Sequence, residues 1–258
     1  MSKKIVADWR VSENVRLNSD YFLLKVRLDQ ELPEMFPGQF VQILVKNSPG
    51  TFLRRPISIH FVDTVRNEIW LLIQIVGEGT RHLSLLKPGD SINLIAPLGN
   101  HFTFPKKDDN VLLVGGGVGI APLYFFGIKL QERGISPHFL LGARNVDALL
   151  QLNEFCECGE TNTTTEDGSH GEKGFVTHHS SLQSQRYDRI YTCGPKPMMQ
   201  AVAKYAKEKG CFCEVSLENM MACGIGACLC CVEKTVKGNI CVCTEGPVFN
   251  IKDLTWPI

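Results

Sequence analysis

The sequence predicts three parts: an N-terminal antiparallel β-barrel, a central α/β domain built on a parallel sheet, and a small cysteine-rich C-terminal domain. Short β-rich runs separated by Gly and Pro turns fill the first part. In the second part, apolar strand patterns alternate with helical patterns. Six of the 11 cysteines fall between Cys223 and Cys243. We place the three domains at residues 1–104, 105–210 and 211–258.

Composition narrows the class of protein. Apolar residues make up 44% of the 258 residues, enough for a substantial core. Lys plus Arg and Asp plus Glu number 27 each, so the formal net charge is zero. The charge therefore gives no indication of a nucleic-acid or membrane-surface partner. The first residues lack the apolar run of a signal peptide, and no stretch is long enough for a membrane helix. We therefore expect a cytoplasmic protein.

The barrel is predicted from four runs rich in β-branched and aromatic residues. Turn sequences such as Phe36-Pro-Gly and Lys87-Pro-Gly-Asp separate these runs. The spacing is that of a small barrel or sandwich. The predicted strands are residues 21–28, 39–45, 57–62 and 69–76.

The central domain is predicted from buried strands that are followed by helices. Strands alternating with helices form βαβ units and a parallel sheet. Residues 159–174 are polar and rich in Gly and Thr, so we expect a loop there. The predicted strands are residues 111–114, 138–141 and 189–192, and the predicted helices are 122–133 and 197–209.

A glycine-rich turn follows the first of these strands. Glycines at such a turn allow positive φ and close approach of a phosphate, and the following helix directs free N–H groups toward it. Pro122 is acceptable in the first helical turn. The turn indicates either a phosphate site or a purely structural bend. Its glycines are Gly115, Gly116, Gly117 and Gly119.

A second strand-to-helix turn contains Cys193, Gly194 and Pro195. In open parallel sheets such turns lie at the carboxyl ends of the strands, where ligands bind. Cys193 either faces a bound nicotinamide or is a small buried residue, since free cysteine packs as a small hydrophobe. The sequence leaves both interpretations open.

Two motifs in the barrel offer phosphate-binding groups. In Arg54-Arg-Pro-Ile-Ser-Ile, a strand arginine with a serine three positions on can bind a diphosphate or a flavin edge. The same arginine could instead pair with a carboxylate. In Gly77-Glu-Gly-Thr-Arg, glycine N–H groups again follow a strand. Neither motif is specific by itself.

The C-terminal cysteines carry the strongest pattern. Cys223, Cys228 and Cys231 have C-x4-C-x2-C spacing, and Cys243 follows after eleven intervening residues. This is the plant-type spacing of a [2Fe–2S] cluster, whereas structural zinc also accepts four cysteines. The glycine-filled first gap favours iron–sulfur. Cys230 adjoins the third ligand, so the choice of Cys231 rests on spacing.

The remaining part of the cysteine-rich tail has little material for a core. We expect it to require its metal centre to fold. Four further cysteines form two C-x-C pairs that we interpret as ordinary thiols: Cys156, Cys158, Cys211 and Cys213.

The order of the motifs resembles the ferredoxin–NADP reductase superfamily. Arg-Pro-Ile-Ser at 55–58, Gly-Glu-Gly-Thr at 77–80, the 115–122 turn and Cys-Gly-Pro at 193–195 carry this resemblance. The tail resembles the electron-transfer subunits of NAD-dependent dihydroorotate dehydrogenases. That narrower resemblance rests on three segments: Met221–Cys228, Val242–Phe249 and Asp167–Thr177.

The resemblance implies FAD, NAD and a [2Fe–2S] cluster as cofactors. A nicotinamide exchanges two electrons and a cluster one, and a flavin joins the two. The implied FAD-binding residues are Arg55, Pro56, Ile57, Ser58, Leu72, Ile73, Gln74, Gly79 and Thr80. The implied dinucleotide residues are Gly115, Gly116, Gly117, Gly119, Cys193, Gly194 and Pro195. The implied cluster ligands are Cys223, Cys228, Cys231 and Cys243.

The resemblance also implies a partner subunit that carries FMN and oxidises dihydroorotate, in a heterotetramer with two copies of each chain. Electrons would pass from FMN through the cluster and FAD to NAD⁺, and no residue of this chain need act as an acid or base on dihydroorotate. Cys230 departs from the Gly that is common before the third ligand. Arg144 could meet a 2′-phosphate or pair with Asp147, so the preference for NADH or NADPH is open.

Two alternatives remain. A related flavin and iron–sulfur reductase could serve sulfide or ferredoxin–NADP chemistry through another partner. A zinc-stabilised binding module could keep the fold without its chemistry.

Overall fold

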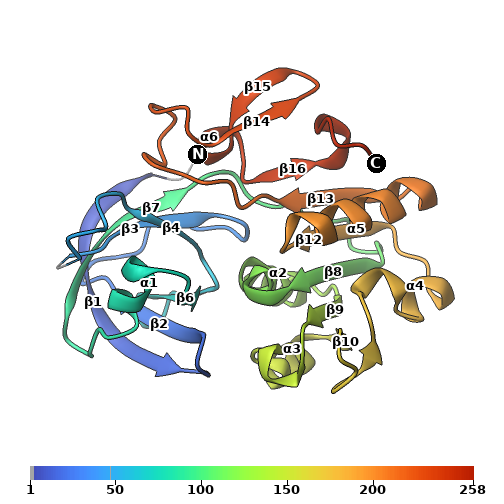
Figure 1. Cartoon of the computed structure of the whole chain (residues 1–258), viewed down its shortest axis with the longest axis horizontal. Coiled ribbons are helices and arrows are strands. Elements are labelled where there is room, and N and C mark those ends of the chain that lie inside the picture. Colours follow the sequence, from blue (N-terminus) through green and yellow to red (C-terminus); the bar gives the residue numbers. More distant parts are fainter. Residues whose placement is uncertain (1–2, 47) are drawn as a thin grey trace.

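Antiparallel strands form the N-terminal part in the computed structural model, which describes residues 3–46 and 48–258 (Figure 1). Their order across the sheet is β4-β3-β7-β1-β2-β6-β5. The bounds are β1 (Ile5–Arg16), β2 (Tyr21–Arg27), β3 (Phe40–Leu44), β4 (Arg55–Ser58), β5 (Phe61–Asp63), β6 (Glu68–Gln74) and β7 (Ser91–Leu98).

Strands β4 and β5 lie at opposite edges of this sheet although they are consecutive in the chain. The change occurs where Ile59 N–H donates to Gln39 O (3.0 Å) and His60 N–H donates to Trp70 O (2.9 Å). The sheet is therefore wrapped round so that residues 55–63 supply both of its edge strands. The predicted single strand at 57–62 was wrong, because this change of partner divides it.

The inside of the wrapped sheet is apolar. Trp9, Phe22, Val41 and Ile43 are fully buried there and belong to one cluster. Trp9 comes from β1, a strand that the sequence patterns did not single out. Its exposed and buried residues are interspersed along an amphipathic strand.

The central sheet has the order β11-β10-β9-β8-β12-β13-β16 and is parallel except for β16. This confirms the predicted fold class. The bounds are β8 (Val111–Gly116), β9 (His138–Ala143), β10 (Glu160–Thr165), β11 (Glu172–Lys173), β12 (Arg189–Cys193), β13 (Phe212–Ser216) and β16 (Val248–Asn250).

Strand β10 occupies part of the segment predicted as a loop at 159–174, so that prediction was wrong. The strand pairs in parallel with β9 from Glu160 to Thr165, and Thr164 and Thr165 are buried. Threonine is β-branched and suits a strand, and a neighbouring strand satisfies its backbone. The loop was predicted from the polarity of the segment, which does not reflect the preference of threonine for strands.

Helices cover both faces of the central sheet. Along β8, Val111 and Leu113 pack with α2 and α3, whereas Leu112 and Val114 pack with α5. Within the described residues, no helix is long and apolar enough to cross a membrane. The helical bounds are η1 (Gly117–Ile120), α2 (Ala121–Gln131), η2 (Val146–Ala148), α3 (Leu152–Cys158), η3 (Val176–His178), α4 (Ser181–Ser184) and α5 (Lys196–Lys209).

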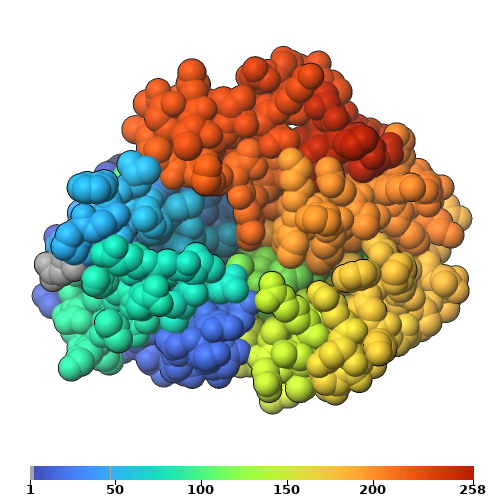
Figure 2. Space-filling view, in the orientation of Figure 1, coloured from blue at the N-terminus to red at the C-terminus, as the bar shows by residue number. Residues whose placement is uncertain are grey.

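The C-terminal tail lies across the barrel and the α/β part (Figures 1 and 2). Cys243, Phe249 and Trp256 share an apolar cluster with barrel and α5 residues. Strands β13 and β16 of this tail also complete the central sheet. The division at residue 210 stays a prediction. The other elements are β14 (Val232–Thr235), β15 (Gly238–Cys241), α6 (Val242–Glu245) and η4 (Ile251–Asp253).

Candidate functional site

A first cavity of about 330 Å³ lies between the barrel and residues 216–221 of the tail. Strands β4 and β6 and helix α1 (Glu78–Leu83) supply its barrel wall. Eight of the nine residues predicted to bind FAD line it: Arg55, Pro56, Ile57, Ser58, Leu72, Ile73, Gln74 and Thr80. The structure thus brings together residues from two separate motifs, and their role as FAD ligands stays a prediction.

The Arg55 side chain lies at the wall of this cavity. Its Nη1 donates to the Leu53 carbonyl at 2.9 Å, and no carboxylate of the described residues lies within ion-pair distance. A Cβ placed on Gly79 would lie 3.2 Å from Arg55 Nε, so the ninth predicted residue lies beside this guanidinium. The Gly77 N–H donates to Thr80 Oγ1 at 3.2 Å and is already satisfied within the turn.

A second, larger cavity of about 570 Å³ opens at the carboxyl ends of the central strands. Of the predicted dinucleotide residues, Gly116, Gly117, Gly119 and Pro195 line it, whereas Gly115, Cys193 and Gly194 are not among its lining residues. The two predicted turns meet there.

The contact between the turns explains one glycine. A Cβ on Gly119 would lie 2.5 Å from the Cys193 carbonyl oxygen and 2.5 Å from the Gly194 Cα. No real Cβ makes so close a contact with backbone, so only glycine fits here without a shift. Gly117 has φ +55°, which also favours glycine.

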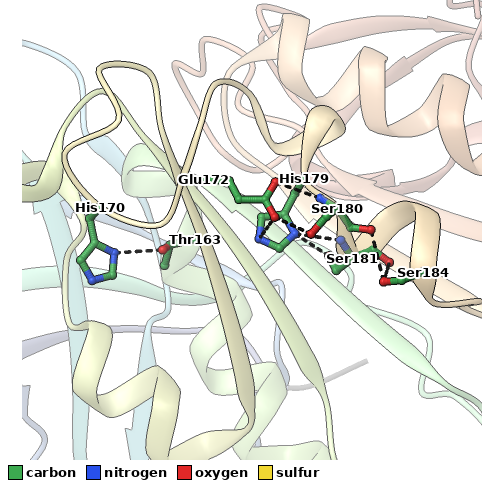
Figure 3. A network of polar contacts seen from close by, with 7 residues as sticks. All are labelled: Thr163, His170, Glu172, His179, Ser180, Ser181 and Ser184. Carbon is green, nitrogen blue, oxygen red and sulfur yellow. Dashed lines mark hydrogen bonds and ion pairs between the residues drawn. The ribbon is translucent and has the colours of Figure 1, made fainter.

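A polar network joins the two ends of the segment 174–177, which lines the second cavity (Figure 3). The Ser181 N–H donates to His179 Nδ1 at 3.1 Å, so the ring proton is on Nε2, 3.5 Å from Glu172 Oε1. Glu172 also accepts from Ser180 N–H at 3.0 Å and from its hydroxyl, and these bonds lower the pKa of Glu172. The network orders Gly174–Thr177, which line the cavity.

Two opposite charges also line this cavity. Arg144 follows β9 and Glu166 follows β10, at neighbouring strand ends. Among the described residues Arg144 makes no ion pair with Asp147, whose backbone carbonyl accepts from Asn18 Nδ2 at 2.8 Å. Sequence reasoning missed Glu166, because it lies well beyond the roughly 20 residues that separate a ribose-binding acid from the Gly-rich turn in dinucleotide folds.

The two cavities are adjacent, since Gln74, Val118 and Glu218 line both. Desolvation of the carboxyl group raises the pKa of Glu218, although the residue as a whole is exposed. The Cys193 thiol lies 3.9 Å from Glu218 Oε1, and burial, with the nearby carboxylate, raises its pKa well above the usual range. Cys193 is thus a buried neutral thiol at the border. Glu218 was also missed, and its only sequence signal is its place just beyond β13.

The cysteine loop at 223–231 turns its backbone N–H groups toward sulfur. Cys223 Sγ accepts from Ile225, Ala227 and Cys228 N–H at 3.3–3.4 Å. Burial alone would raise the pKa of Cys223, but these N–H donors outweigh it and lower the pKa to about 6. A thiol with so low a pKa is largely thiolate at neutral pH, the form that binds metal.

The same loop reaches the later ligand. The Gly226 N–H donates to Cys243 Sγ at 3.2 Å, and the Cys243 N–H donates to Cys231 Sγ at 3.4 Å. Cys231 and Cys243 are buried, whereas the neighbouring Cys230 is exposed. These contacts support Cys231 as the third ligand, and the complete ligand set stays a prediction.

Backbone N–H···S bonds at 3.4 Å link the predicted ligands two by two: the Cys228 N–H donates to Cys223 Sγ, and the Cys243 N–H donates to Cys231 Sγ. Within the part of the chain that the structure describes, no three His, Cys, Asp or Glu side chains converge on a single-ion position. A [2Fe–2S] cluster takes its four cysteines over two irons, and two adjacent pairs suit it. The four cysteine sulfurs therefore fit a [2Fe–2S] cluster.

Comparison with known families identifies the three parts. The iron–sulfur cluster binding domain of dihydroorotate dehydrogenase B matches residues 218–255. An oxidoreductase NAD-binding domain matches residues 113–204, and an oxidoreductase FAD-binding domain matches residues 8–103. The predicted cofactors FAD, NAD and an iron–sulfur cluster are confirmed at this level, against the zinc alternative.

Curated relatives extend over nearly the whole chain. The dihydroorotate dehydrogenase B (NAD(+)) electron transfer subunit of Fusobacterium nucleatum is 39% identical over 257 residues, covering 96% of this chain and 98% of that protein. The chain belongs to this family of electron transfer subunits. The Lysinibacillus sphaericus subunit of the same name is 40% identical over 222 residues, covering 84% of this chain and 86% of that protein.

Solved structures agree with the family fold. A chain from the NADH-dependent reduced ferredoxin-NADP oxidoreductase structure has a TM-score of 0.86 and 32% identity, covering 97% of this chain and 90% of that chain. The flavohemoglobin of Malassezia yamatoensis, with a TM-score of 0.69 and 17% identity over 82% of this chain and 60% of its own, shares the fold alone. Along this electron transfer subunit the FAD-binding domain comes first, the NAD-binding domain second and the iron–sulfur domain last.

Proposed function

We propose that this chain carries electrons from an FMN-containing dihydroorotate dehydrogenase subunit, through a [2Fe–2S] cluster and FAD, to NAD⁺ in the cytoplasm. Such a pathway serves pyrimidine biosynthesis, and the family implies a heterotetramer with two copies of each subunit. The cluster supplies one-electron exchange, the nicotinamide a two-electron exchange, and the flavin joins them.

The observation that carries the proposal is that the two cavities adjoin each other and that the first adjoins the segment just before the cysteine loop. Gln74, Val118 and Glu218 line both cavities, and Met221, two residues before Cys223, lines the first. Ligands in the three predicted sites would therefore be neighbours. Electron exchange between cofactors requires that proximity.

The residues of this chain position and shield the cofactors. Arg55 presents a guanidinium without a carboxylate partner among the described residues, which suits a diphosphate. Gly119 allows the two strand-end turns to close on each other behind the second cavity. Glu218 lines both cavities, and desolvation of its carboxyl group raises its pKa, so this group can hold a proton there. No side chain here is assigned to acid–base chemistry on dihydroorotate.

The test compares the chain alone with the chain bound to its candidate FMN subunit. The chain alone should contain FAD and iron and oxidise NADH with an artificial dye. Only the complex should reduce NAD⁺ with dihydroorotate. A chain that oxidises dihydroorotate unaided would contradict the proposal.

One pair of variants localises the relay. Cys223→Ser should remove the EPR signal of the reduced cluster and abolish NAD⁺ reduction by dihydroorotate, but leave NADH–dye activity within about threefold, because flavin and nicotinamide still meet. Cys156→Ser is the matched control, since Cys156 is an exposed thiol in α3. Equal loss in both variants, or an unchanged cluster in Cys223→Ser, would contradict the relay.

A second candidate is supported by the likeness to the NADH-dependent reduced ferredoxin-NADP oxidoreductase structure. In that case the partner would be a different redox subunit. Purification with each candidate partner distinguishes the two: stable association and NAD⁺ reduction with dihydroorotate favour the first function. Association only with a ferredoxin-dependent subunit favours the second.

A further inference from the structure

Gln42 is a fully buried polar residue whose burial has no explanation in the barrel itself. Its neighbours Val41 and Ile43 on β3 point into the barrel core. Side chains alternate along a strand, so Gln42 faces the opposite side with Phe40, which packs in the cluster shared with the tail. The side chain is 0% exposed. The tail therefore covers Gln42.

The amide of Gln42 lies against the cysteine loop. A Cβ placed on Gly224 would lie 2.6 Å from Gln42 Cγ and 2.7 Å from Gln42 Nε2. Gly224 has φ +71° and directly follows Cys223, so the glycine both makes the turn and leaves room for the amide. The contact joins the barrel to the loop that holds the predicted cluster.

Both polar atoms of this amide are without a partner. Gln42 Nε2 and Oε1 are buried, and neither makes a hydrogen bond to any residue that the structure describes. Buried polar groups are nearly always satisfied, and leaving one unpaired is costly. The backbone of Gln42 is held in the sheet, because Gln42 pairs with Pro56 and Ile95 and its carbonyl accepts from Arg54 Nη1 at 3.2 Å. The orphaned amide indicates a ligand at this place.

The position of Gln42 is between two predicted redox sites. Its cross-strand partner Pro56 lines the first cavity, and its side chain contacts the residue after Cys223. The Cys223 sulfur already accepts three backbone N–H groups on its own loop. An amide N–H from the barrel would add a donor from outside the loop. Hydrogen bonds to the sulfurs set the potential of an iron–sulfur cluster.

We propose that Gln42 Nε2 donates a hydrogen bond to a sulfur of the cluster held by Cys223 and raises its reduction potential. Gln42 is a positioning residue: it ligates no iron and acts through the sulfur. A donor stabilises the reduced cluster more than the oxidised one, because the reduced cluster carries more negative charge. The inference rests on the proposed cluster site and adds a barrel residue to its surroundings.

The test is an EPR-monitored redox titration of the complex with its partner, comparing wild type with Gln42→Met. Methionine has a similar length but no N–H donor. The expected result is unchanged iron content and an approximately tenfold higher oxidised-to-reduced ratio at a fixed ambient potential, equivalent to a midpoint about 59 mV more negative.

Gln39→Met is the matched control. Gln39 directly precedes β3 and is also buried, but its amide is satisfied, because Phe36 N–H donates to its Oε1 (2.8 Å) and its Nε2 donates to Gly99 O (3.1 Å). We expect the cluster potential of Gln39→Met to equal that of wild type. An equal shift in both variants would overturn the inference, as would a shift confined to the flavin potential.

A measurement on wild type keeps the inference testable if Gln42→Met does not fold. Protein labelled with ¹⁵N only in glutamine side-chain amides should show a ¹⁵N coupling to the reduced cluster in pulsed EPR. Absence of that coupling in iron-loaded protein overturns the role of Gln42 and leaves the proposed function intact. A wild-type complex that contains no iron would overturn the proposed function instead.

Discussion

His60 provides a test of how the barrel is joined to the α/β part. It lies between β4 and β5, is fully buried, and stacks on Tyr124 of α2 with ring centroids 5.0 Å apart. Its Nδ1 is 2.9 Å from the carbonyl oxygen of Ala121, so the neutral ring donates there. The perturbation is His60→Gln, which keeps a donor but cannot titrate.

The magnitude follows from the pKa of His60. Burial lowers it from 6.5 to about 4, against the opposing effect of the bond to Ala121 O. The unfolded chain therefore binds this proton more readily below pH 6.5, and stability is lost as pH falls from 6.5 toward 4. At about 1.36 kcal/mol per pKa unit, the loss is about 2 kcal/mol at pH 5 and approaches about 3 kcal/mol below pH 4.

The assay is thermal unfolding of the FAD-loaded chain at pH 7.5 and pH 5. Other titrating groups affect wild type and variant alike, so the difference between them isolates His60. A domain of this size shifts by about 2–4 °C per kcal/mol. Between the two pH values the melting temperature of wild type should therefore fall about 4–8 °C further than that of His60→Gln.

His101→Gln is the control, because His101 Nδ1 makes a similar 2.9 Å contact to the Phe102 carbonyl although its side chain is exposed. The melting temperature of His101→Gln should fall between pH 7.5 and pH 5 by the same amount as that of wild type. A difference between wild type and His60→Gln that does not change with pH would refute the reasoning, as would an NMR titration of His60 with a midpoint near 6.5.

Three further predictions follow from the cavities and thiols. Gly119→Ala should lower the free energy of unfolding by about 1–3 kcal/mol in urea titrations, because the new Cβ meets backbone atoms; an unchanged midpoint would contradict this. Glu166→Gln should raise the KM for NADH about tenfold and reduce the preference for NADH over NADPH, since a carboxylate can bind ribose hydroxyls and repel a 2′-phosphate. An unchanged ratio of the KM values for NADH and NADPH would exclude this role of Glu166. Iodoacetamide should label exposed Cys156 well over a hundredfold faster than Cys158, whose pKa burial raises to about 12, and equal labelling by mass spectrometry would disprove this burial.

Local patterns in the sequence were sufficient for the order of the parts and for the chemistry of the tail. The spacing from Cys223 to Cys231 depends only on how a short loop can direct thiolates, and the loop's N–H···S bonds agree with it. The 115–119 turn likewise follows from glycine conformation directly after a strand. Such features are set by neighbours in the chain, so the sequence alone reveals them.

Only the tertiary structure decided where strands and polar side chains meet. Residues 55–63 supply both edge strands of the barrel sheet by pairing with β3 and β6, and the Thr-rich β10 is placed by pairing with β9. No local pattern shows either pairing. Glu218 and Gln42 carry no motif: Glu218 lines the border of the two cavities, and Gln42 becomes fully buried beneath the tail. The physical reason is that burial of a polar group depends on which distant segments cover it, and that choice is made by packing of the whole chain.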